Sequence, residues 1–362
     1  MTAATANRLV GRAFVGPAFD YLLIGGGLSL LVVLAVLLDP SGLVASMFSL
    51  SGASVAGYAT VAWFILFSNS AHFASSTVRL YTMEGHRESW PFLTMAFPLV
   101  IVGVLWVAMT VPEDLGPHIQ ALYLTWSPFH YAAQAYGLAV MYSYRSGCLL
   151  TLQDKRLLRI VAMIPFVYTF LVQTGGGRTG LPWLLPFDLV GTPWWQGVVL
   201  VLEPLLTLAA FGLPILLMVR LWRSQVGPMP LISLLIVLSN AVWWFALNTL
   251  DAFLLATVFH GIQYLAIVII FHVRDQQARP DNRRGVLWHV LTFYGGCFAL
   301  GYGLFHLAPQ AFILLGFGAV ESFLLVGAAI NIHHFIVDGF IWKLRKGTSN
   351  RTIVDQAAPG VA

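Results

Sequence analysis

Residues 250–272 read LDAFLLATVFHGIQYLAIVIIFH, and this stretch decides the fold class. Asp251, near its beginning, is its only residue with a formal charge at neutral pH. A helix needs about 20 consecutive, mainly apolar residues to cross a bilayer. The stretch therefore predicts a transmembrane helix that carries His260, Gln263 and Tyr264 to membrane depth.

The whole chain has the same character. Of its 362 residues, 58% belong to the set AVILMFWYC and only 9% are charged, whereas a soluble domain carries about 25% charged residues. This composition excludes a soluble globular domain, a disordered chain, a disulfide scaffold and a nucleic-acid-binding protein. The two cysteines, Cys148 and Cys297, fall in different predicted segments, and no disulfide is expected.

Apolar stretches of this length recur along the chain and predict an all-α, polytopic integral membrane helical bundle. We expect ten transmembrane helices, at residues 19–38, 53–75, 91–112, 117–142, 156–173, 195–219, 228–248, 250–272, 286–307 and 310–341. Residues 1–347 form the single transmembrane domain in this prediction, and residues 348–362 form a disordered cytoplasmic tail.

The basic residues predict the orientation, because Lys and Arg concentrate in cytoplasmic loops. A cytoplasmic N-terminus places all 19 Lys and Arg residues except Arg178 in cytoplasmic segments. An even number of spans returns the C-terminus to the same side. We therefore expect a multi-pass protein of the bacterial cytoplasmic (inner) membrane with both termini inside, whose short basic loops contact anionic lipids.

Histidines at membrane depth are the strongest functional signal, because ionisable groups there are costly and mark functional sites. Half of the ten histidines lie well inside predicted spans, namely His72, His130, His260, His333 and His334. The other five lie in a loop or near helix ends, where they reach water. Imidazole binds iron, copper and zinc, so these five intramembrane histidines are candidate metal ligands.

Polar side chains stand one helical turn from these histidines, on the same helix faces. They are Asn69, Gln134, Gln263 and Asp338. A metal-bound imidazole needs its second nitrogen held by an amide, carbonyl or carboxylate, so the three amides are expected to orient imidazoles. Asp338 is a candidate ligand or base, and Tyr264 a candidate proton donor. Hydrogen bonding between helices is the simpler alternative for each of these groups.

Counting the helical rise back from the first cytoplasmic basic residue gives approximate depths. His72 and His334 lie about 10 and 14 Å from the cytoplasmic end, and His130 and His260 about 21–22 Å. The two pairs thus differ by roughly 10 Å. This spread favours two neighbouring metals, or one metal and another cofactor, over one compact mononuclear site.

Single intramembrane histidines on several helices resemble the Brp/Blh-type bacterial membrane carotenoid oxygenases, which are multi-helix, non-haem iron proteins. The resemblance implies that His72, His130, His260 and His334 bind iron. We expect His333 to be an added or alternative ligand. The resemblance also implies oxygen-dependent attack on a lipid-soluble substrate, such as a carotenoid or an acyl chain.

Two alternatives stay open. One is a haem-binding redox protein, with haem b bound between His130 and His260. Elements of haem-copper oxidases resemble two features of this sequence, the string His260-Gly-Ile-Gln-Tyr264 and the pair His333–His334. A transporter or assembly protein without enzymatic activity is the other alternative, although carboxylates at mid-membrane depth are scarce, with Glu321 the main candidate.

Overall fold

A computed structural model describes residues 9–39, 63–82, 90–172, 180–184, 192–224 and 226–342. Within these ranges the chain forms helices joined by short turns, and no β-strand occurs there. The all-α fold class is therefore confirmed. The predicted tail at 348–362 and residues 53–62 of the second predicted span lie outside the described residues.

The chain divides into two compact units. Unit 1 comprises Met1–Val61, Thr125–Gln263 and Thr348–Ala362, and unit 2 comprises Ala62–Leu124 and Tyr264–Gly347. Two helices, α9 (Pro112–Arg145) and α14 (Thr249–Gln277), contain the residues at which one unit ends and the other begins. Both helices run through these boundaries without a break, so the rise of 1.5 Å per residue applies along the whole of α9 and α14.

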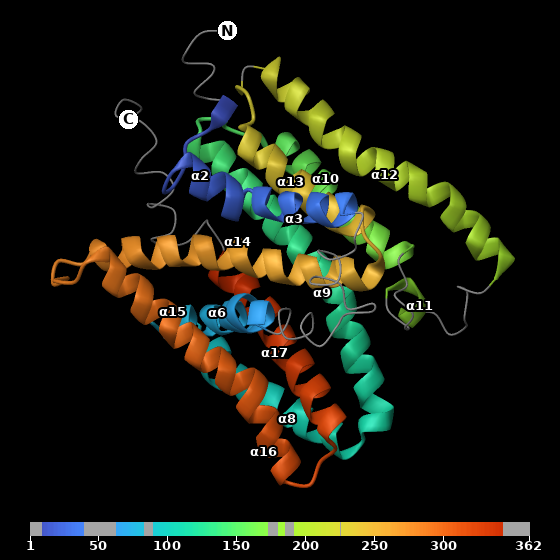
Figure 1. Cartoon of the computed structure of the whole chain (residues 1–362), viewed down its shortest axis with the longest axis vertical. Helices are drawn as coiled ribbons and strands as arrows, with labels where there is room; N and C mark the ends of the chain where they lie inside the picture. Colours follow the sequence, from blue (N-terminus) through green and yellow to red (C-terminus); the bar gives the residue numbers. More distant parts are fainter. Residues whose placement is uncertain are drawn as a thin grey trace. The chain divides into compact units, whose positions relative to one another are not determined.

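Unit 1 is built around α13, which packs against α10, α12, α3 and the π-helical segment η1. In Figure 1, α10, α12 and α13 lie side by side. The bounds of its elements are α2 (Pro17–Phe19), η1 (Asp20–Ile24), α3 (Gly27–Leu38), α10 (Leu152–Leu171), α11 (Leu181–Leu184), α12 (Pro193–Trp222) and α13 (Leu231–Phe245).

The first predicted span, 19–38, is bent rather than straight. Pro17–Ile24 and Gly27–Leu38 meet at an angle of 58°. Gly26 lies in this bend with φ +82°, and a Cβ there would lie 2.6 Å from the Cβ of Ser239. Glycine is needed at this position because it alone adopts the left-handed conformation without strain and lets α13 approach.

Unit 2 is built around α17, which packs against α6, α8 and α16, while α15 packs against α6. Its elements are η2 (Ile65–Ser70), α6 (Ala71–Thr82), η3 (Phe92–Ala96), α8 (Phe97–Thr110), α15 (Val286–Tyr302), η4 (Gly303–Leu307), α16 (Ala308–Leu314) and α17 (Ala319–Ile341).

The last predicted span, 310–341, is wrong as a continuous helix. A turn separates α16, which ends at Leu314, from α17, which begins at Ala319. Gly316 adopts φ +96° in this turn, a conformation that residues with a side chain rarely adopt. The sequence analysis overlooked the residues Gly316 and Gly318 as a helix-ending signal.

Among the described residues, five helices are long and apolar enough to cross a membrane, or six with the bent Pro17–Leu38 pair. The five are Phe92–Thr110, Pro193–Trp222, Thr249–Gln277, Val286–Leu314 and Ala319–Ile341. They indicate an integral membrane protein. The predicted count of ten spans and the predicted orientation stay predictions.

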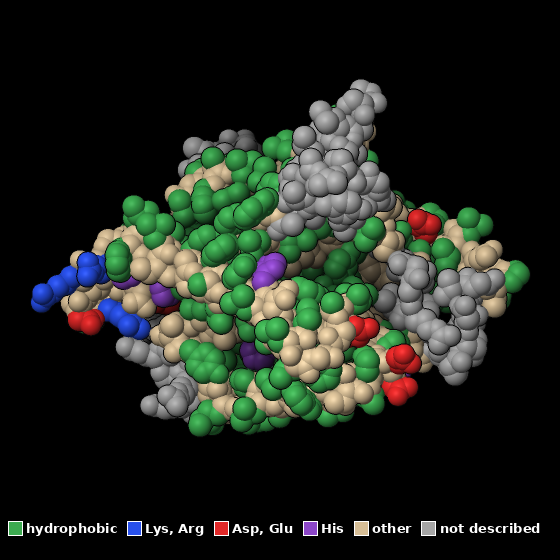
Figure 2. All heavy atoms as spheres, turned by 60° about the horizontal axis from the view of Figure 1, so that its bottom comes forward, with side chains coloured by type: hydrophobic (Ala, Val, Ile, Leu, Met, Phe, Trp, Pro, Cys, Tyr) green, Lys and Arg blue, Asp and Glu red, His purple; other side chains and the backbone are tan. Residues whose placement is uncertain are grey.

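Exposed side chains support the membrane assignment. Along α12, Leu200, Leu208 and Leu216 are 77%, 72% and 63% exposed. Hydrophobic side chains cover much of the face seen in Figure 2, and charged ones are few. Such a surface suits contact with lipid, because a soluble protein exposes no apolar area of this extent.

Candidate metal centre

Four of the ten histidines form a group that could hold a metal ion. They are His72, His130, His260 and His334, and all four are buried. Two belong to each compact unit, so the site is described as two histidine pairs.

The unit 1 pair consists of His130 on α9 and His260 on α14. Their ring centroids lie 4.9 Å apart with the ring planes at 74°. A ring nitrogen of one lies within 4.8 Å of a ring nitrogen of the other, which is close enough for both to bind one ion. The ring of Tyr131 covers His260 at 4.3 Å, and the Tyr131 hydroxyl hydrogen-bonds with that of Thr257 at 2.8 Å.

The unit 2 pair consists of His72 on α6 and His334 on α17. Their ring centroids lie 4.3 Å apart, and Ser76 Oγ lies 2.9 Å from His334 Nδ1. When Nδ1 donates its hydrogen to Ser76, Nε2 keeps the lone pair that a metal requires. Ser76 is thus the residue that can hold an imidazole of this pair in the tautomer suited to a metal.

The backbone before His72 is a π-helical segment, η2, which passes directly into α6. A π-turn adds one residue to the helix and rotates all later side chains, and such segments are frequent at functional sites. Helix α15 packs closely here, because a Cβ on Gly301 would lie 2.4 Å from the carbonyl oxygen of Ser70. Helix packing at Gly301 therefore supports the π-turn that orients His72.

A tyrosine and a carboxylate lie next to the unit 2 pair. The Tyr264 ring is 4.6 Å from that of His72, and its hydroxyl donates to Asp338 Oδ1 at 2.5 Å. Asp338 Oδ2 is 3.6 Å from His334 Nε2, which is longer than a hydrogen bond. Trp342 Nε1 donates to the Tyr264 hydroxyl at 3.0 Å. The structure thus brings the two predicted acid–base residues, Tyr264 and Asp338, into direct contact.

Tyr264 follows His260 by four residues on α14, about 6 Å along its axis, and the Tyr264 ring packs against His72. The difference in depth that the sequence predicts between the two histidine pairs stays a prediction.

Two of the three amides that were expected to orient imidazoles bond to backbone carbonyls instead. Gln134 Nε2 donates to the backbone carbonyl of His260 at 3.3 Å, and Gln263 Nε2 donates to the carbonyl of Ile24 at 3.0 Å. The buried Oδ1 of Asn69 has no hydrogen-bond partner within the described ranges. An orienting role for these amides stays a prediction.

His333 lies outside the group of four. Its ring stacks on Phe97, with the centroids 5.2 Å apart and the planes at 13°. Adjacent residues on a helix point about 100° apart, so His333 and His334 do not share a face of α17. Of the histidines assigned to interfaces, His289 bonds with Asn282 and His306 stacks on Tyr302.

A buried arginine, Arg79, lies two turns after His72 on α6. Its Nη2 forms an ion pair with Asp275 Oδ2 at 3.3 Å, and its guanidinium lies 5.4 Å from the Trp342 ring centroid. Trp342 in turn donates to Tyr264, so Arg79 contacts the side chain that supports the candidate acid–base pair. Arg79 follows His72 by seven residues and so shares its face of α6, but helical spacing alone indicates neither Asp275 nor Trp342 as a neighbour.

Neither cysteine joins the histidines. Both are free and buried. Burial, together with the charge of Asp154, raises the pKa of the Cys148 thiol, in the turn after α9, to about 12. Neither thiol belongs to the group of residues that could hold a metal ion.

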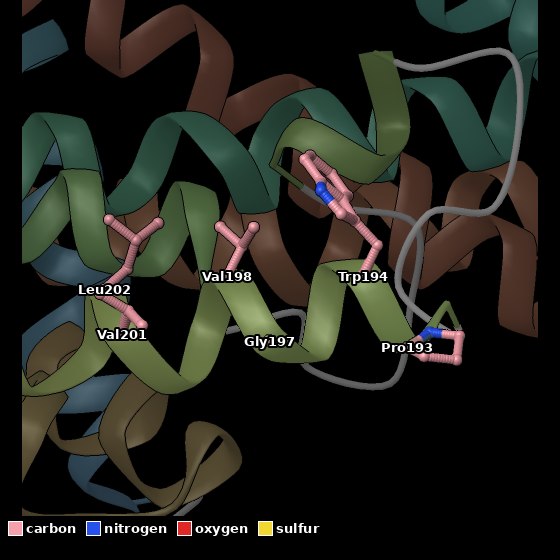
Figure 3. Close-up of a pocket in the computed structure, with 6 residues that line it drawn as sticks. All are labelled: Pro193, Trp194, Gly197, Val198, Val201 and Leu202. Carbon is pink, nitrogen blue, oxygen red and sulfur yellow. The ribbon is translucent and has the colours of Figure 1, made fainter.

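A separate apolar depression lies along the beginning of α12 (Figure 3). It is lined by Pro193, Trp194, Gly197, Val198, Val201 and Leu202. None of these residues is titratable or a usual metal ligand, so the depression lacks the chemistry of the histidine group.

No protein-family model matches the chain, and neither do the curated proteins or the solved structures. Its function is therefore argued from the site alone.

Proposed function

We propose that the protein is a multi-pass membrane metalloenzyme in which His72, His130, His260 and His334 bind one iron ion. The observation that carries the proposal is the group of four buried histidines, two in each unit, in an apolar helical chain. A membrane helix seldom keeps even one such residue without a function, because burying its polar ring costs free energy.

One shared site is proposed because the ligand atoms of the four histidines lie within 4.8 Å of one another. The four imidazoles would hold the ion, and Tyr264, one turn after His260 on α14, contacts His72.

Haem b between His130 and His260 is the less favoured alternative. Their ring centroids lie only 4.9 Å apart, and the two rings would have to separate to admit a macrocycle between them.

The reaction we propose is oxygen-dependent attack on a lipid-soluble substrate, such as a carotenoid or an acyl chain. A bound iron supplies the oxygen chemistry. Tyr264 is placed to donate a proton beside His72, and Asp338 accepts the hydrogen bond that orients the Tyr264 hydroxyl. The buried, apolar surroundings exclude water and suit a substrate that enters from the bilayer. The proposal places the protein in the bacterial cytoplasmic membrane, in contact with lipid.

The test is the metal content and absorption spectrum of detergent-purified protein. We expect about one iron per chain and no Soret band. His130→Ala and His260→Ala should lose the iron while still inserting into the membrane. His306→Ala is the matched control, since that ring stacks on Tyr302 outside the group, and it should keep the iron.

Other results would contradict the proposal in different ways. A Soret band would move the assignment to a haem protein. Absence of bound metal after growth with ample iron, copper and zinc would reduce the histidines to helix–helix contacts or a proton path, as in a transporter. Iron retained in both His130→Ala and His260→Ala would remove the unit 1 pair from the site.

A further inference from the structure

Unit 1 contains buried polar groups that no hydrogen bond within the described residues satisfies. Asn240 is 1% exposed, and both its Oδ1 and its Nδ2 lack a partner. Trp244 is 2% exposed, and its Nε1 lacks one too. The buried Oε1 of Gln134 is in the same condition. Buried polar groups are nearly always hydrogen-bonded, so several unpartnered groups in one region call for a ligand or water.

Contacts between α9 and α13 place these groups at one level of unit 1. Tyr131 stacks on Trp244 with ring centroids 6.4 Å apart, and Ser233 Oγ donates to the carbonyl of Ala139 at 2.8 Å. The two helices therefore run antiparallel. Asn240 precedes Trp244 by one turn on α13. Because the helices are antiparallel, Asn240 lies level with the turn of α9 that follows Tyr131, and that turn contains Gln134.

This level is next to the unit 1 histidine pair. Gln134 donates its amide hydrogen to the His260 carbonyl, and the Tyr131 ring lies between those of Trp244 and His260, at 6.4 Å and 4.3 Å. The unpartnered groups thus lie one aromatic side chain away from a proposed metal ligand.

The chemistry of the groups selects the ligand. Trp244 Nε1 and Asn240 Nδ2 are donors, and Asn240 Oδ1 and Gln134 Oε1 are acceptors. All four are neutral. The buried carboxylate of Asp20 does not belong to this set. It accepts a hydrogen bond from Tyr142, which lies eleven residues, or about 16 Å, beyond Tyr131 along α9. A hydroxyl group, which both accepts and donates, fits this set better than a carboxylate, an ammonium or a hydrocarbon.

We infer that Asn240 and Trp244, with Gln134, bind the hydroxyl group of a lipid-soluble molecule beside His130 and His260. The assignment of that molecule as the substrate rests on the proposed function, whereas its binding does not. An internal water offers the same hydroxyl chemistry, and the experiment separates the two sources.

The experiment measures binding of matched probes to the purified full-length protein in detergent. The pairs are zeaxanthin with β-carotene and hexadecanol with hexadecane, which differ only in hydroxyl groups. We expect at least one hydroxylated member to bind about tenfold more tightly than its hydrocarbon, as one or two satisfied hydrogen bonds imply. Trp244→Phe and Asn240→Leu should abolish that preference and leave hydrocarbon binding unchanged.

Trp243→Phe is the matched control on the same helix. Trp243 is equally buried, but its Nε1 donates to Ser29 Oγ at 3.0 Å. Trp243→Phe should therefore keep the preference. It should also lower the melting temperature by more than Trp244→Phe does, because it loses a hydrogen bond in addition to the buried area that both variants lose. Equal binding of both members in both pairs, or a preference that survives Trp244→Phe, would overturn the inference in favour of internal water.

Metal content distinguishes failure of this inference from failure of the proposed function. Asn240→Leu and Trp244→Phe should keep their iron. A hydroxyl preference in a protein that binds no metal would leave the binding site standing and remove the enzyme assignment. Bound iron without any preference would do the reverse.

Discussion

The two histidine pairs are set in different chemical surroundings. The unit 1 pair has neutral neighbours, with Tyr131 bonded to a threonine hydroxyl and Gln134 bonded to a backbone carbonyl. The unit 2 pair has Ser76 on an imidazole nitrogen and the Tyr264–Asp338 contact beside it, with Arg79 close to Trp342. Unit 2 therefore carries the groups that can fix a tautomer or move a proton, and unit 1 the neutral groups that suit a substrate.

This division follows from position along the helices. Arg79, Asp275 and Asp338 lie near those ends of α6, α14 and α17 where charged side chains are frequent in the sequence. Charges are less costly near a membrane surface than at its centre. Beside His130 and His260, the pair predicted to lie deeper, the structure shows the neutral polar groups of Tyr131, Thr257 and Gln134.

The largest expected effect on iron affinity concerns Ser76. Ser76→Ala removes the hydroxyl bonded to His334 Nδ1, and we expect iron affinity to fall about 10–100-fold, as for other partners of metal-bound histidines. Ser75→Ala is the control, because Ser75 Oγ donates only to the His72 carbonyl within its own helix. Titration of the metal-free protein with Fe²⁺ measures both. Equal affinities for the two variants would show that Ser76 does not support the site.

A tyrosine in each unit offers a direct comparison of stability. Tyr264→Phe removes the hydrogen bond from the Tyr264 hydroxyl to the buried Asp338 side chain and should lower the free energy of unfolding by about 1–3 kcal/mol, the cost of removing a partner from a buried polar group. Tyr131→Phe breaks a neutral bond to Thr257 and should cost about 1 kcal/mol. Denaturation in mixed detergent micelles gives both values.

The same pair of variants separates chemistry from packing. Tyr264→Phe should keep its iron and lose turnover on the bound substrate, by about 10²-fold or more if the hydroxyl donates a proton. Tyr131→Phe should turn over normally. Equal loss of stability and activity in both would mean that the two units are equivalent after all.

The smallest expected effect concerns the π-turn before His72. Gly301→Ala puts a methyl group 2.4 Å from the Ser70 carbonyl oxygen, and should cost about 1–3 kcal/mol and weaken iron binding through His72. Gly296→Ala, on the same helix with no atom within 4 Å of the added Cβ, should be neutral or stabilising. A thermal melt and iron content of both variants test this. An unchanged Gly301→Ala protein would show that α15 yields without disturbing the π-turn.

Composition and hydropathy were sufficient to predict the class of protein. A chain with 58% apolar and 9% charged residues has no soluble fold available, and backbone groups in a bilayer must bond within helices. The candidate ligands His72, His130, His260 and His334 also followed from the sequence, because an imidazole inside an apolar stretch is conspicuous. The spacing of Asp338 from His334 and of Tyr264 from His260 added candidate partners on the same faces.

Only the tertiary structure decided which of these residues meet. Helical spacing relates residues within one helix, but the contacts of Tyr264 with Asp338, of Ser76 with His334 and of Tyr131 with His260 join different helices. Those contacts depend on helix tilt, on the π-turn before His72 and on the close approach at Gly301, none of which leaves a period in the sequence. For the same reason His333 was indistinguishable from His334 until packing against Phe97 separated them.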